Sequence, residues 1–254
     1  MMNAVKVREL MIGEGMPVIC ASITGNSREE VLSQARLFET NGADIAEWRA
    51  DWFEDVYDTE KVLDVAESLN RTLDDMPLLF TFRTAREGGE RAMDAKAYVD
   101  LNTAVIQSGY VDVVDVELFT GTDEVSELIR TAHDSNVKVI ASNHDFSKTP
   151  DKDEIVRRLC KMQDLGADIP KIAVMPNSKS DVLVLLSATE EMADKHADRP
   201  IITMSMAGTG MVSRLCGEVF GSALTFGAAA KASAPGQIAV GELRKTLEMI
   251  HAFL

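Results

Sequence analysis

One lysine in this sequence stands where an amine could react with a carbonyl group. Lys171 follows Pro170 and precedes the apolar run 172–175, which should be buried. An inward lysine loses solvation, which lowers its pKa and leaves a neutral, nucleophilic amine for carbonyl chemistry. The alternative is structural, because a lysine at the bottom rim of a barrel can pack its stem and hold its ammonium in water. The sequence position alone slightly favours this structural alternative.

A histidine and several charged residues interrupt other apolar runs in the same way. His144 ends one run, and an imidazole near a reactive lysine can act as general base and acid because its pKa lies near neutral pH. A histidine at a strand end can also be only a hydrogen-bonding residue, and Asp145 would then support the turn. Glu47 and Arg49, two positions apart, share one side of a strand and could form a structural ion pair. The other interruptions are Ser22, Arg83, Glu87, Glu117 and Ser205.

The elements that must position these residues alternate in a regular rhythm. Short apolar runs predict strands over residues 17–24, 44–49, 78–83, 111–118, 138–144, 171–175, 201–206 and 223–226. Longer amphipathic stretches predict helices over residues 28–41, 59–73, 95–108, 123–135, 151–165, 179–196, 211–220 and 240–253. Eight strands that alternate with eight helices predict a parallel sheet in an α/β fold.

Two observations favour closing this sheet into a single (β/α)8 TIM barrel. The strand count is that of the barrel, and no Rossmann glycine fingerprint follows the first strand. The length of 254 residues also suits one barrel, which typically has about 250. We therefore expect one domain over residues 1–254, with residues 1–15 as a cap across the barrel bottom. The polar residues would then meet at the C-terminal ends of the strands, where barrel enzymes keep their active sites.

Composition and charge exclude several classes of partner. The net charge of −15, with no basic stripe to offset it, argues against nucleic acid and anionic membrane surfaces. An anionic substrate would need arginines that reverse the potential locally. Cys20, Cys160 and Cys216 form no CxxC or Cys/His pattern, which indicates buried thiols in a reducing compartment and no zinc site. With no signal-peptide-like segment and no apolar run of about 20 residues, we expect a cytoplasmic protein.

Two weaker signals have two interpretations each. The turn 208–210 (Gly-Thr-Gly) could offer backbone amides to a phosphate at the next helix, or be only a tight turn. Residues 228–237, rich in small side chains, could be a plain connector or a lid that closes over the site.

Short ordered blocks along essentially the whole chain resemble the type I 3-dehydroquinate dehydratase family. The first are EWRAD (47–51), FTFRT (80–84) followed by EGG (87–89), SNHDF (142–146) and PKIAVMP (170–176). Later blocks are MSM (204–206), Ser213-Arg214, GSALTFG (221–227) and ASAPGQ (232–237). Each block alone is weakly specific, whereas so many in order at family-like spacings are strongly specific. We find no departure at the positions to which catalytic roles map.

The resemblance implies a Schiff-base-forming lyase that dehydrates 3-dehydroquinate to 3-dehydroshikimate in the shikimate pathway. Lys171 would bond to the C3 ketone carbon, and the resulting iminium would make the neighbouring C2 proton acidic. His144 would remove that proton and then protonate the departing C1 hydroxyl, while Glu87 would orient the imidazole. The resemblance implies no metal and no organic cofactor.

The same resemblance implies how the substrate is recognised. Arg214 would bind the substrate carboxylate, since a guanidinium matches a planar anion. Contacts to the ring and its hydroxyls would come from Ser22, Glu47, Arg49, Arg83, Met204, Met206, Phe226, Ser233, Ala234 and Gln237. Ser233 and Gln237 would close over the ring from the lid, and the methionines and Phe226 could equally be core residues. The family also implies a homodimer, without indicating its interface.

Residue chemistry alone leaves two alternative functions open. A class I aldolase also uses a barrel lysine, but it cleaves a carbon–carbon bond and usually needs a phosphate site, which only the turn 208–210 suggests. A catalytically silent barrel could bind a hydroxy-acid, but such binding needs neither an imine nor a proton shuttle. The presence of both Lys171 and His144 therefore counts against the silent barrel.

Overall fold

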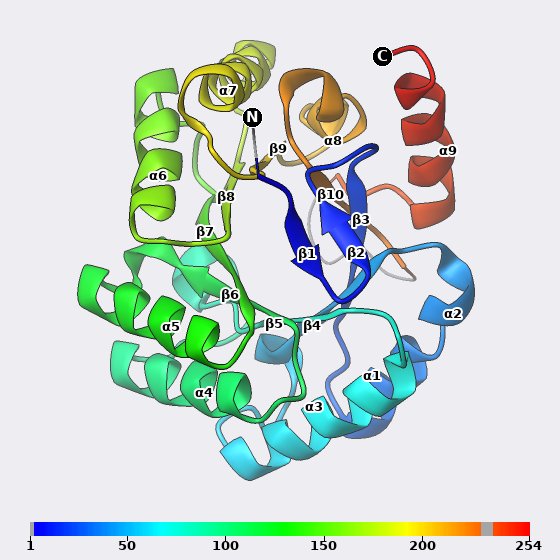
Figure 1. Cartoon of the computed structure of the whole chain (residues 1–254), viewed down its shortest axis with the longest axis vertical. Helices are drawn as coiled ribbons and strands as arrows, with labels where there is room; N and C mark the ends of the chain where they lie inside the picture. The colour runs from blue at the N-terminus through cyan, green and yellow to red at the C-terminus, as the bar shows by residue number, and fades with distance from the viewer. Residues whose placement is uncertain (1–2, 230–235) are drawn as a thin grey trace.

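The computed structural model describes residues 3–229 and 236–254, and its centre is a cylinder of parallel strands (Figure 1). The eight strands lie in the order β10-β3-β4-β5-β6-β7-β8-β9. They are β3 (Val18–Ile23), β4 (Ile45–Arg49), β5 (Leu78–Thr81), β6 (Val113–Glu117), β7 (Lys138–Asp145), β8 (Ile169–Val174), β9 (Ile202–Ser205) and β10 (Leu224–Gly227). An isolated parallel bridge between Ile201 and Ser222 joins the two ends and nearly closes the cylinder. The predicted (β/α)8 TIM barrel is confirmed.

Helices between the strands form an outer ring around this barrel (Figure 1). They are α1 (Arg28–Ala35), α2 (Phe38–Asn41), α3 (Thr59–Leu73), α4 (Ala95–Gln107), α5 (Thr122–Asp134), α6 (Lys152–Asp164), α7 (Lys179–Glu191), α8 (Met211–Leu215) and α9 (Val240–His251). None of the helices within the described ranges is both long enough and apolar enough to cross a membrane.

Three of the predicted helices differ in detail from those observed. The helix predicted over 28–41 is interrupted, because the Leu37 N–H bonds to the Gln34 carbonyl in a turn tighter than an α-helix, which separates α1 from α2. The helix predicted over 179–196 continues beyond α7 as a π-helix, Met192–His196. The helix predicted over 211–220 is reduced to α8 and a 3-10 turn, Glu218–Phe220.

Strand β8 begins at Ile169, before the predicted start at Lys171. Proline cannot donate a hydrogen bond to a sheet ladder, so Pro170 is an unexpected strand residue. Its place in the register explains why it is tolerated. Strand β7 pairs with Ile169 and Pro170, whereas pairing with β9 begins only at Lys171. Lys171 therefore lies within the strand and not at its first position.

Alternation along the strands divides the barrel interior into an apolar floor and a polar upper layer. In β4, Ala46 and Trp48 pack outward into the core beneath the helices, whereas Ile45 packs inside the barrel. Glu47 and Arg49 lie on the same inward side as Ile45, because side chains on one face of a strand recur every second residue. They are nearer the C-terminal end of the strand than Ile45 is. The apolar floor includes Cys20, Ile45, Leu79, Val113, Ile140, Ile169 and Ile202.

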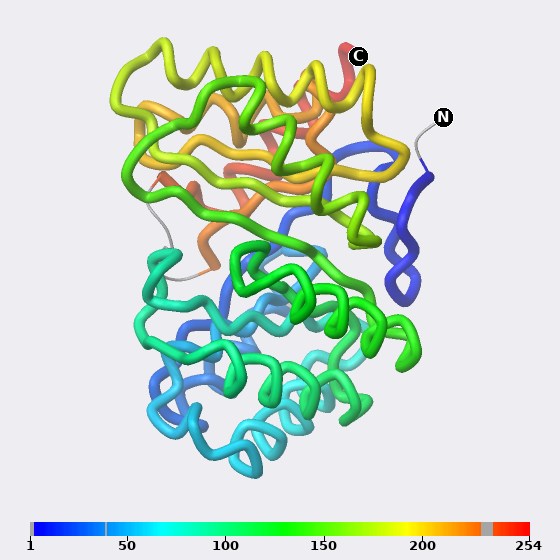
Figure 2. Tube along the Cα trace, turned by 90° about the vertical axis from the view of Figure 1, so that its left-hand side faces the viewer, coloured from blue at the N-terminus to red at the C-terminus, as the bar shows by residue number. Residues whose placement is uncertain are grey.

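An N-terminal hairpin covers the floor at the opposite end from the polar layer. It consists of β1 (Val5–Val7) and β2 (Leu10–Ile12), paired antiparallel. Val5, Val7 and Ile12 belong to the same buried cluster as the floor residues. The side view shows this hairpin at one edge of the molecule, next to the N-terminus (Figure 2).

Candidate active site

A cavity opens at the C-terminal ends of the barrel strands, above the apolar floor. Its lining residues are Glu47, Arg49, Arg83, Glu87, Gly88, His144, Phe146, Lys171, Ala173, Met204, Met206, Arg214, Phe226 and Gln237. Nearly all residues predicted for the site are therefore brought together here. The exceptions are Ser22, which is not a lining residue but pairs with Glu47 in the sheet register, and Ser233 and Ala234, which lie outside the described residues.

Lys171 points into the barrel from the middle of β8. Its side chain is 3% exposed, and Nζ donates to Asp115 Oδ2 at 2.9 Å. The ammonium also lies 4.6 Å from the centre of the Phe226 ring, which is a favourable cation–π distance. The structural alternative, a lysine at the barrel bottom with its ammonium in water, is wrong.

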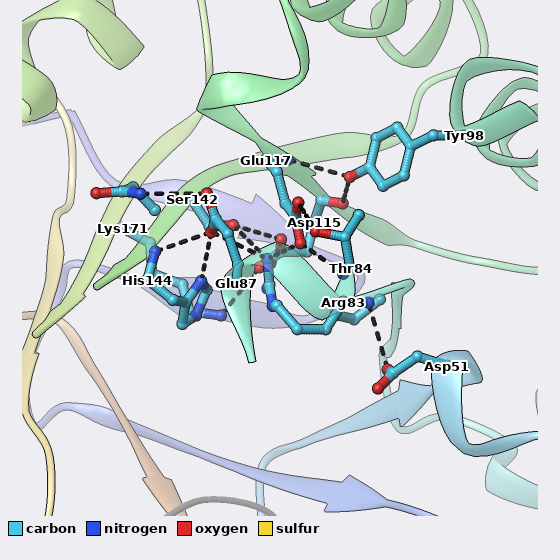
Figure 3. Close-up of polar contacts among 12 residues, drawn as sticks. Asp51, Arg83, Thr84, Glu87, Tyr98, Asp115, Glu117, Ser142, His144 and Lys171 are labelled. Carbon is cyan, nitrogen blue, oxygen red and sulfur yellow. Dashed lines mark hydrogen bonds and ion pairs between the residues drawn. The ribbon is translucent and has the colours of Figure 1, made fainter. Parts of the chain in front are cut away.

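The carboxylate that holds the Lys171 amine, Asp115, is fully buried in β6. Its other oxygen, Oδ1, accepts hydrogen bonds from Arg83 Nη2 at 2.7 Å and from Ser142 Oγ at 2.5 Å (Figure 3). Burial by itself would raise the pKa of Asp115, but the Arg83 guanidinium and the Lys171 ammonium outweigh burial and hold this pKa well below its usual range. Asp115 is therefore ionised.

The imidazole of His144 is oriented by Glu87. Nδ1 lies 3.0 Å from Glu87 Oε2, and the same oxygen accepts a hydrogen bond from the His144 backbone N–H at 2.8 Å. Asn143 Nδ2 donates to Glu87 Oε1 at 3.1 Å, and Arg158 Nη1 donates to Asn143 Oδ1 at 2.8 Å. Because the carboxylate assigns the ring proton to Nδ1, Nε2 is the nitrogen that can accept a proton from a ligand.

Burial shifts the pKa values of both members of this pair toward their uncharged forms. Burial, followed by the positive charges of Arg83 and Lys171, lowers the pKa of His144 well below its usual value. Burial and the neighbouring Glu117 carboxylate raise the pKa of Glu87 to about 7, against an opposing effect of Arg83. A neutral imidazole can accept a proton at neutral pH, as a general base must.

Arg83 is a tightly held cation at the base of the cavity. Nη1 donates to Glu117 Oε1 and to Ser142 Oγ, both at 3.0 Å, while Nη2 donates to Asp115. Burial would lower the pKa of Arg83, but Asp115 and Glu117 raise it well above its usual value. Arg83 therefore has a structural role, because it connects the loop after β5 to strand β6. This role is independent of any contact that Arg83 makes with a ligand.

Glu47 is fixed by two hydroxyl groups from the neighbouring strands. Ser22 Oγ donates to Oε2 at 2.5 Å, and Thr81 Oγ1 donates to Oε1 at 3.0 Å. In this arrangement Ser22 holds the Glu47 carboxylate in place, and its predicted direct contact with a substrate stays a prediction.

Arg49 forms its ion pair with Asp51, and not with Glu47 as one interpretation of the sequence had it. Nε and Nη2 bind the two oxygens of Asp51 at 2.8 and 2.9 Å. Asp51 also accepts hydrogen bonds from the backbone N–H groups of Arg83 and Glu90. This buried carboxylate thus positions Arg49 and anchors the loop after β5.

The far wall of the cavity is mostly apolar. Met204 and Met206 come from β9 and its end, and Phe226 comes from β10. Arg214 reaches the same wall from α8, where Nη1 lies 3.4 Å from Met204 Sδ. Burial lowers the pKa of Arg214 to about 10, because the buried guanidinium has lost hydration.

Sequence reasoning gave no role to Asp115, Ser142, Asn143 or Asp51. A usable signal existed for Asp115. It stands in the middle of the strand Val-Val-Asp-Val-Glu, on the same side as Glu117. A carboxylate inside a buried strand needs a cation or strong donors, so this position predicts a partner such as Lys171 or Arg83.

The cysteines lie in different parts of the fold, with Cys20 in the apolar floor of the barrel and Cys160 against the core beneath the helices. All three cysteines are free thiols, of which Cys20 is buried while Cys160 and Cys216 are half-buried. The prediction that the cysteines are buried is therefore fully confirmed only for Cys20. In the part of the chain that the structure describes, no group of three His, Cys, Asp or Glu side chains could hold a metal ion.

Comparison with known proteins agrees with this geometry. A family model described as type I 3-dehydroquinase matches residues 19–253. The 3-dehydroquinate dehydratase of Salmonella typhimurium is 57% identical over 250 residues, which cover 98% of this chain and 99% of that protein.

Solved structures of two relatives superpose closely on this chain. Type I 3-dehydroquinate dehydratase from Clostridium difficile, with covalent modified comenic acid, has a TM-score of 0.97 and 52% identity over the whole of both chains. The 3-dehydroquinate dehydratase from Geobacillus kaustophilus HTA426 has a TM-score of 0.96 and 39% identity, covering 99% of this chain and 97% of that one. With both sequence and structure matched over nearly the full length, the chain belongs to the type I 3-dehydroquinase family.

Proposed function

We propose that this chain dehydrates 3-dehydroquinate to 3-dehydroshikimate, a step of the shikimate pathway, through a Schiff base at Lys171. The observation that carries the proposal is the buried Lys171 amine, 2.9 Å from Asp115 and in the same cavity as the His144 imidazole. Membership of the family supplies the substrate, since the relatives are 3-dehydroquinate dehydratases.

The first stage joins the enzyme to the substrate. Lys171 gives up one proton, and the Nζ lone pair forms a bond to the C3 carbonyl carbon. Nζ then loses a second proton, while the carbonyl oxygen takes up one proton to become the hydroxyl of a neutral carbinolamine. A second proton then lets this oxygen leave as water, and the C3–Nζ bond becomes a protonated imine. The iminium is an electron sink for the neighbouring carbon C2.

The second stage removes water from the ring. Nε2 of His144 accepts a proton from C2, and the released electron pair is delocalised through C3 onto the iminium nitrogen as an enamine. His144 then returns a proton to the C1 hydroxyl, which leaves as water while C1 and C2 become doubly bonded. Hydrolysis of the iminium by one water molecule restores the Lys171 amine and releases the product. Positioned proton transfer of this kind contributes about 10²–10⁴-fold to the rate.

Recognition would depend on the arginines that line the cavity of a protein whose net charge is −15. Arg214 would bind the substrate carboxylate through its guanidinium fork. Glu47, Arg49 and Arg83 would bind the ring hydroxyls from below. The apolar wall, with Gln237 and the predicted contacts Ser233 and Ala234, would enclose the rest of the ring.

Assembly and location are also part of the proposal, the homodimer from the family resemblance and the cytoplasm from a cysteine pattern typical of a reducing compartment. A homodimer in the cytoplasm is expected, and sedimentation equilibrium would give its mass directly. A monomeric mass at micromolar protein would contradict the homodimer without affecting the proposed chemistry.

The test of the function combines turnover with covalent trapping. The protein is incubated with 3-dehydroquinate, the conjugated enone is followed by ultraviolet absorbance, and borohydride is added before peptide mass spectrometry. We expect turnover and a reduced adduct on Lys171, and neither with the Lys171→Met control. An adduct on another residue would refute the lysine assignment. Binding without turnover would favour the silent barrel, and cleavage of a carbon–carbon bond would favour the aldolase.

A further inference from the structure

Asp115 makes two kinds of contact with its two carboxylate oxygens. Oδ1 is held by the protein, through Arg83 Nη2 at 2.7 Å and Ser142 Oγ at 2.5 Å. Oδ2 accepts the hydrogen bond from Lys171 Nζ at 2.9 Å. The carboxylate is fully buried and Lys171 is 3% exposed, so water screens this ion pair very little. One oxygen therefore fixes the group, and the other faces the reacting nitrogen.

The positive charge on Nζ is the same before and after imine formation. An ammonium and a carbonyl group give a protonated imine and one water molecule, so each side of this step carries one positive charge. The protonated imine retains one N–H, which can donate to the same carboxylate oxygen as the ammonium did. A carboxylate that pairs with the resting lysine can therefore also pair with the covalent intermediate.

We propose that Asp115 is the counterion of the Lys171 iminium and keeps this covalent intermediate protonated during dehydration. The inference rests on the proposed imine at Lys171 and adds a catalytic residue to it. A neutral imine withdraws electrons from C2 far less than an iminium, so the C2 proton becomes acidic only while the nitrogen keeps its charge. The counterion maintains that charge in the buried cavity, where burial alone would favour the neutral imine.

The neighbouring charged groups are committed elsewhere. Glu47 accepts hydrogen bonds from Ser22 and Thr81, Glu87 binds His144, and Glu117 binds Arg83 and Thr84. Among the residues that the structure describes, the charged or titratable groups that surround the Lys171–Asp115 pair are Cys20 on β3, Glu47 and Arg49 on β4, Arg83 and Glu87 after β5, Tyr98 on α4, Glu117 on β6, His144 on β7 and Arg214 on α8.

Glu117 provides a matched control for Asp115. Both carboxylates lie on the same side of β6, both are buried, and both bind the Arg83 guanidinium. Asp115 contacts Nζ, whereas the recorded hydrogen bonds of the Glu117 side chain go to Arg83 and Thr84. Asp115→Asn and Glu117→Gln therefore each remove one negative charge from the same cluster, but only the first removes it from the reacting nitrogen.

The experiment measures single-turnover dehydration and the yield of borohydride-reduced Lys171 as functions of pH. We expect the basic limb of both profiles to move to lower pH by about one to three units in Asp115→Asn, because an iminium without its counterion loses its proton more readily. Glu117→Gln should move this limb much less, and Asp115→Glu should restore it in part. Equal shifts in the two amide variants, or no shift in Asp115→Asn, would overturn the counterion role.

Failure of the proposed function would look different. In that case the wild-type protein itself would give no reduced adduct at Lys171, at any pH. If Asp115→Asn does not fold, a crystal structure of the reduced wild-type adduct decides the question. We expect Asp115 Oδ2 to lie about 3 Å from the substituted Nζ. A carboxylate turned away from this nitrogen would contradict the inference.

Discussion

A single oxygen of Glu87 fixes both the ring and the backbone of His144. Oε2 lies 3.0 Å from the ring Nδ1 and 2.8 Å from the backbone nitrogen. Glu87 ends the 3-10 helix η2 (Ala85–Glu87), and Gly88 follows with a φ of 83°, which turns the chain away after the carboxylate has been placed. The contact therefore joins the loop after β5 to the end of β7 and leaves Nε2 directed at the cavity.

We expect Glu87→Gln to lower kcat by about 10- to 100-fold, which is at or below the lower limit of the total contribution of general acid–base catalysis, about 10²–10⁴-fold. A glutamine amide has only one acceptor oxygen, so its NH2 group would face either His144 or the amide of Asn143, both of which donate to Glu87 in the wild-type protein. Steady-state kinetics measures the loss. Borohydride trapping at Lys171 should persist, and an unchanged kcat would mean that the imidazole is oriented without this carboxylate.

The acid limb of the pH profile should report the same pair. The pKa of Glu87 is raised to about 7, chiefly by burial. As the pH falls through this value, Glu87 gains a proton and no longer stabilises the imidazolium that forms when His144 accepts the substrate proton. Wild-type kcat/KM, which reports the groups of the free enzyme, should therefore decrease as the pH falls through about 7. The limb belongs to the coupled pair of Glu87 and His144, so an unchanged limb in Glu87→Gln would exclude Glu87 from the titration that sets it.

His144→Ala separates imine formation from dehydration. The Lys171 amine is held by Asp115, without help from the imidazole, so the reduced adduct should still form. Dehydration should fall by about 10²–10⁴-fold, because the C2 proton loses its acceptor and the C1 hydroxyl its donor. Ultraviolet absorbance of the enone and peptide mass spectrometry measure the two steps on one sample. Dehydration at nearly the wild-type rate would exclude the proton-shuttle role.

The sequence predicts this fold well because its dominant signals are local. Buried strands and amphipathic helices differ in length and periodicity, so eight alternating pairs could be recognised directly. The break between α1 and α2 depends on one tight turn at Leu37, which leaves no mark on the periodicity. Strand β8 begins with Ile169 and Pro170 because pairing there involves β7 alone, a fact of register that one segment cannot reveal.

The site could be predicted only in part, because partners come from different strands. A motif containing Lys171 or His144 can be recognised by its own residues. The partner of Lys171 is Asp115, 56 positions earlier in the chain and on a strand two places away in the barrel. For Arg49 the difficulty is different, because two possible carboxylate partners, Glu47 and Asp51, are equally near in sequence. Only the backbone turn after β4 decides that Asp51 binds it.

Removal of Asp51 should destabilise the fold because it leaves the Arg49 cation buried without its carboxylate. The Arg49 side chain is 11% exposed and that of Asp51 is fully buried. We expect Asp51→Ala to lower the free energy of unfolding by about 3–5 kcal/mol, measured by urea denaturation. The double variant Arg49→Met with Asp51→Ala should recover part of this loss, since no uncompensated charge remains. A double variant as unstable as the single one would assign the effect to the lost backbone contacts of Asp51.

Substitution of Arg214 should weaken substrate binding without destabilising the fold, in contrast to removal of Asp51. Burial lowers its pKa to about 10, so the loss of hydration disfavours its charge, and an apolar side chain of similar length carries no such cost. We therefore expect Arg214→Met to leave the free energy of unfolding unchanged or to raise it. KM for 3-dehydroquinate should increase by roughly 10- to 100-fold, because a charge-assisted hydrogen bond to the substrate carboxylate is lost.

Arg214→Lys is the matched control, since it keeps the charge without the planar fork. Its KM should fall between those of the wild-type protein and Arg214→Met. Destabilisation by more than about 2 kcal/mol in Arg214→Met would show that this guanidinium serves the fold, and the carboxylate would then need another binding residue.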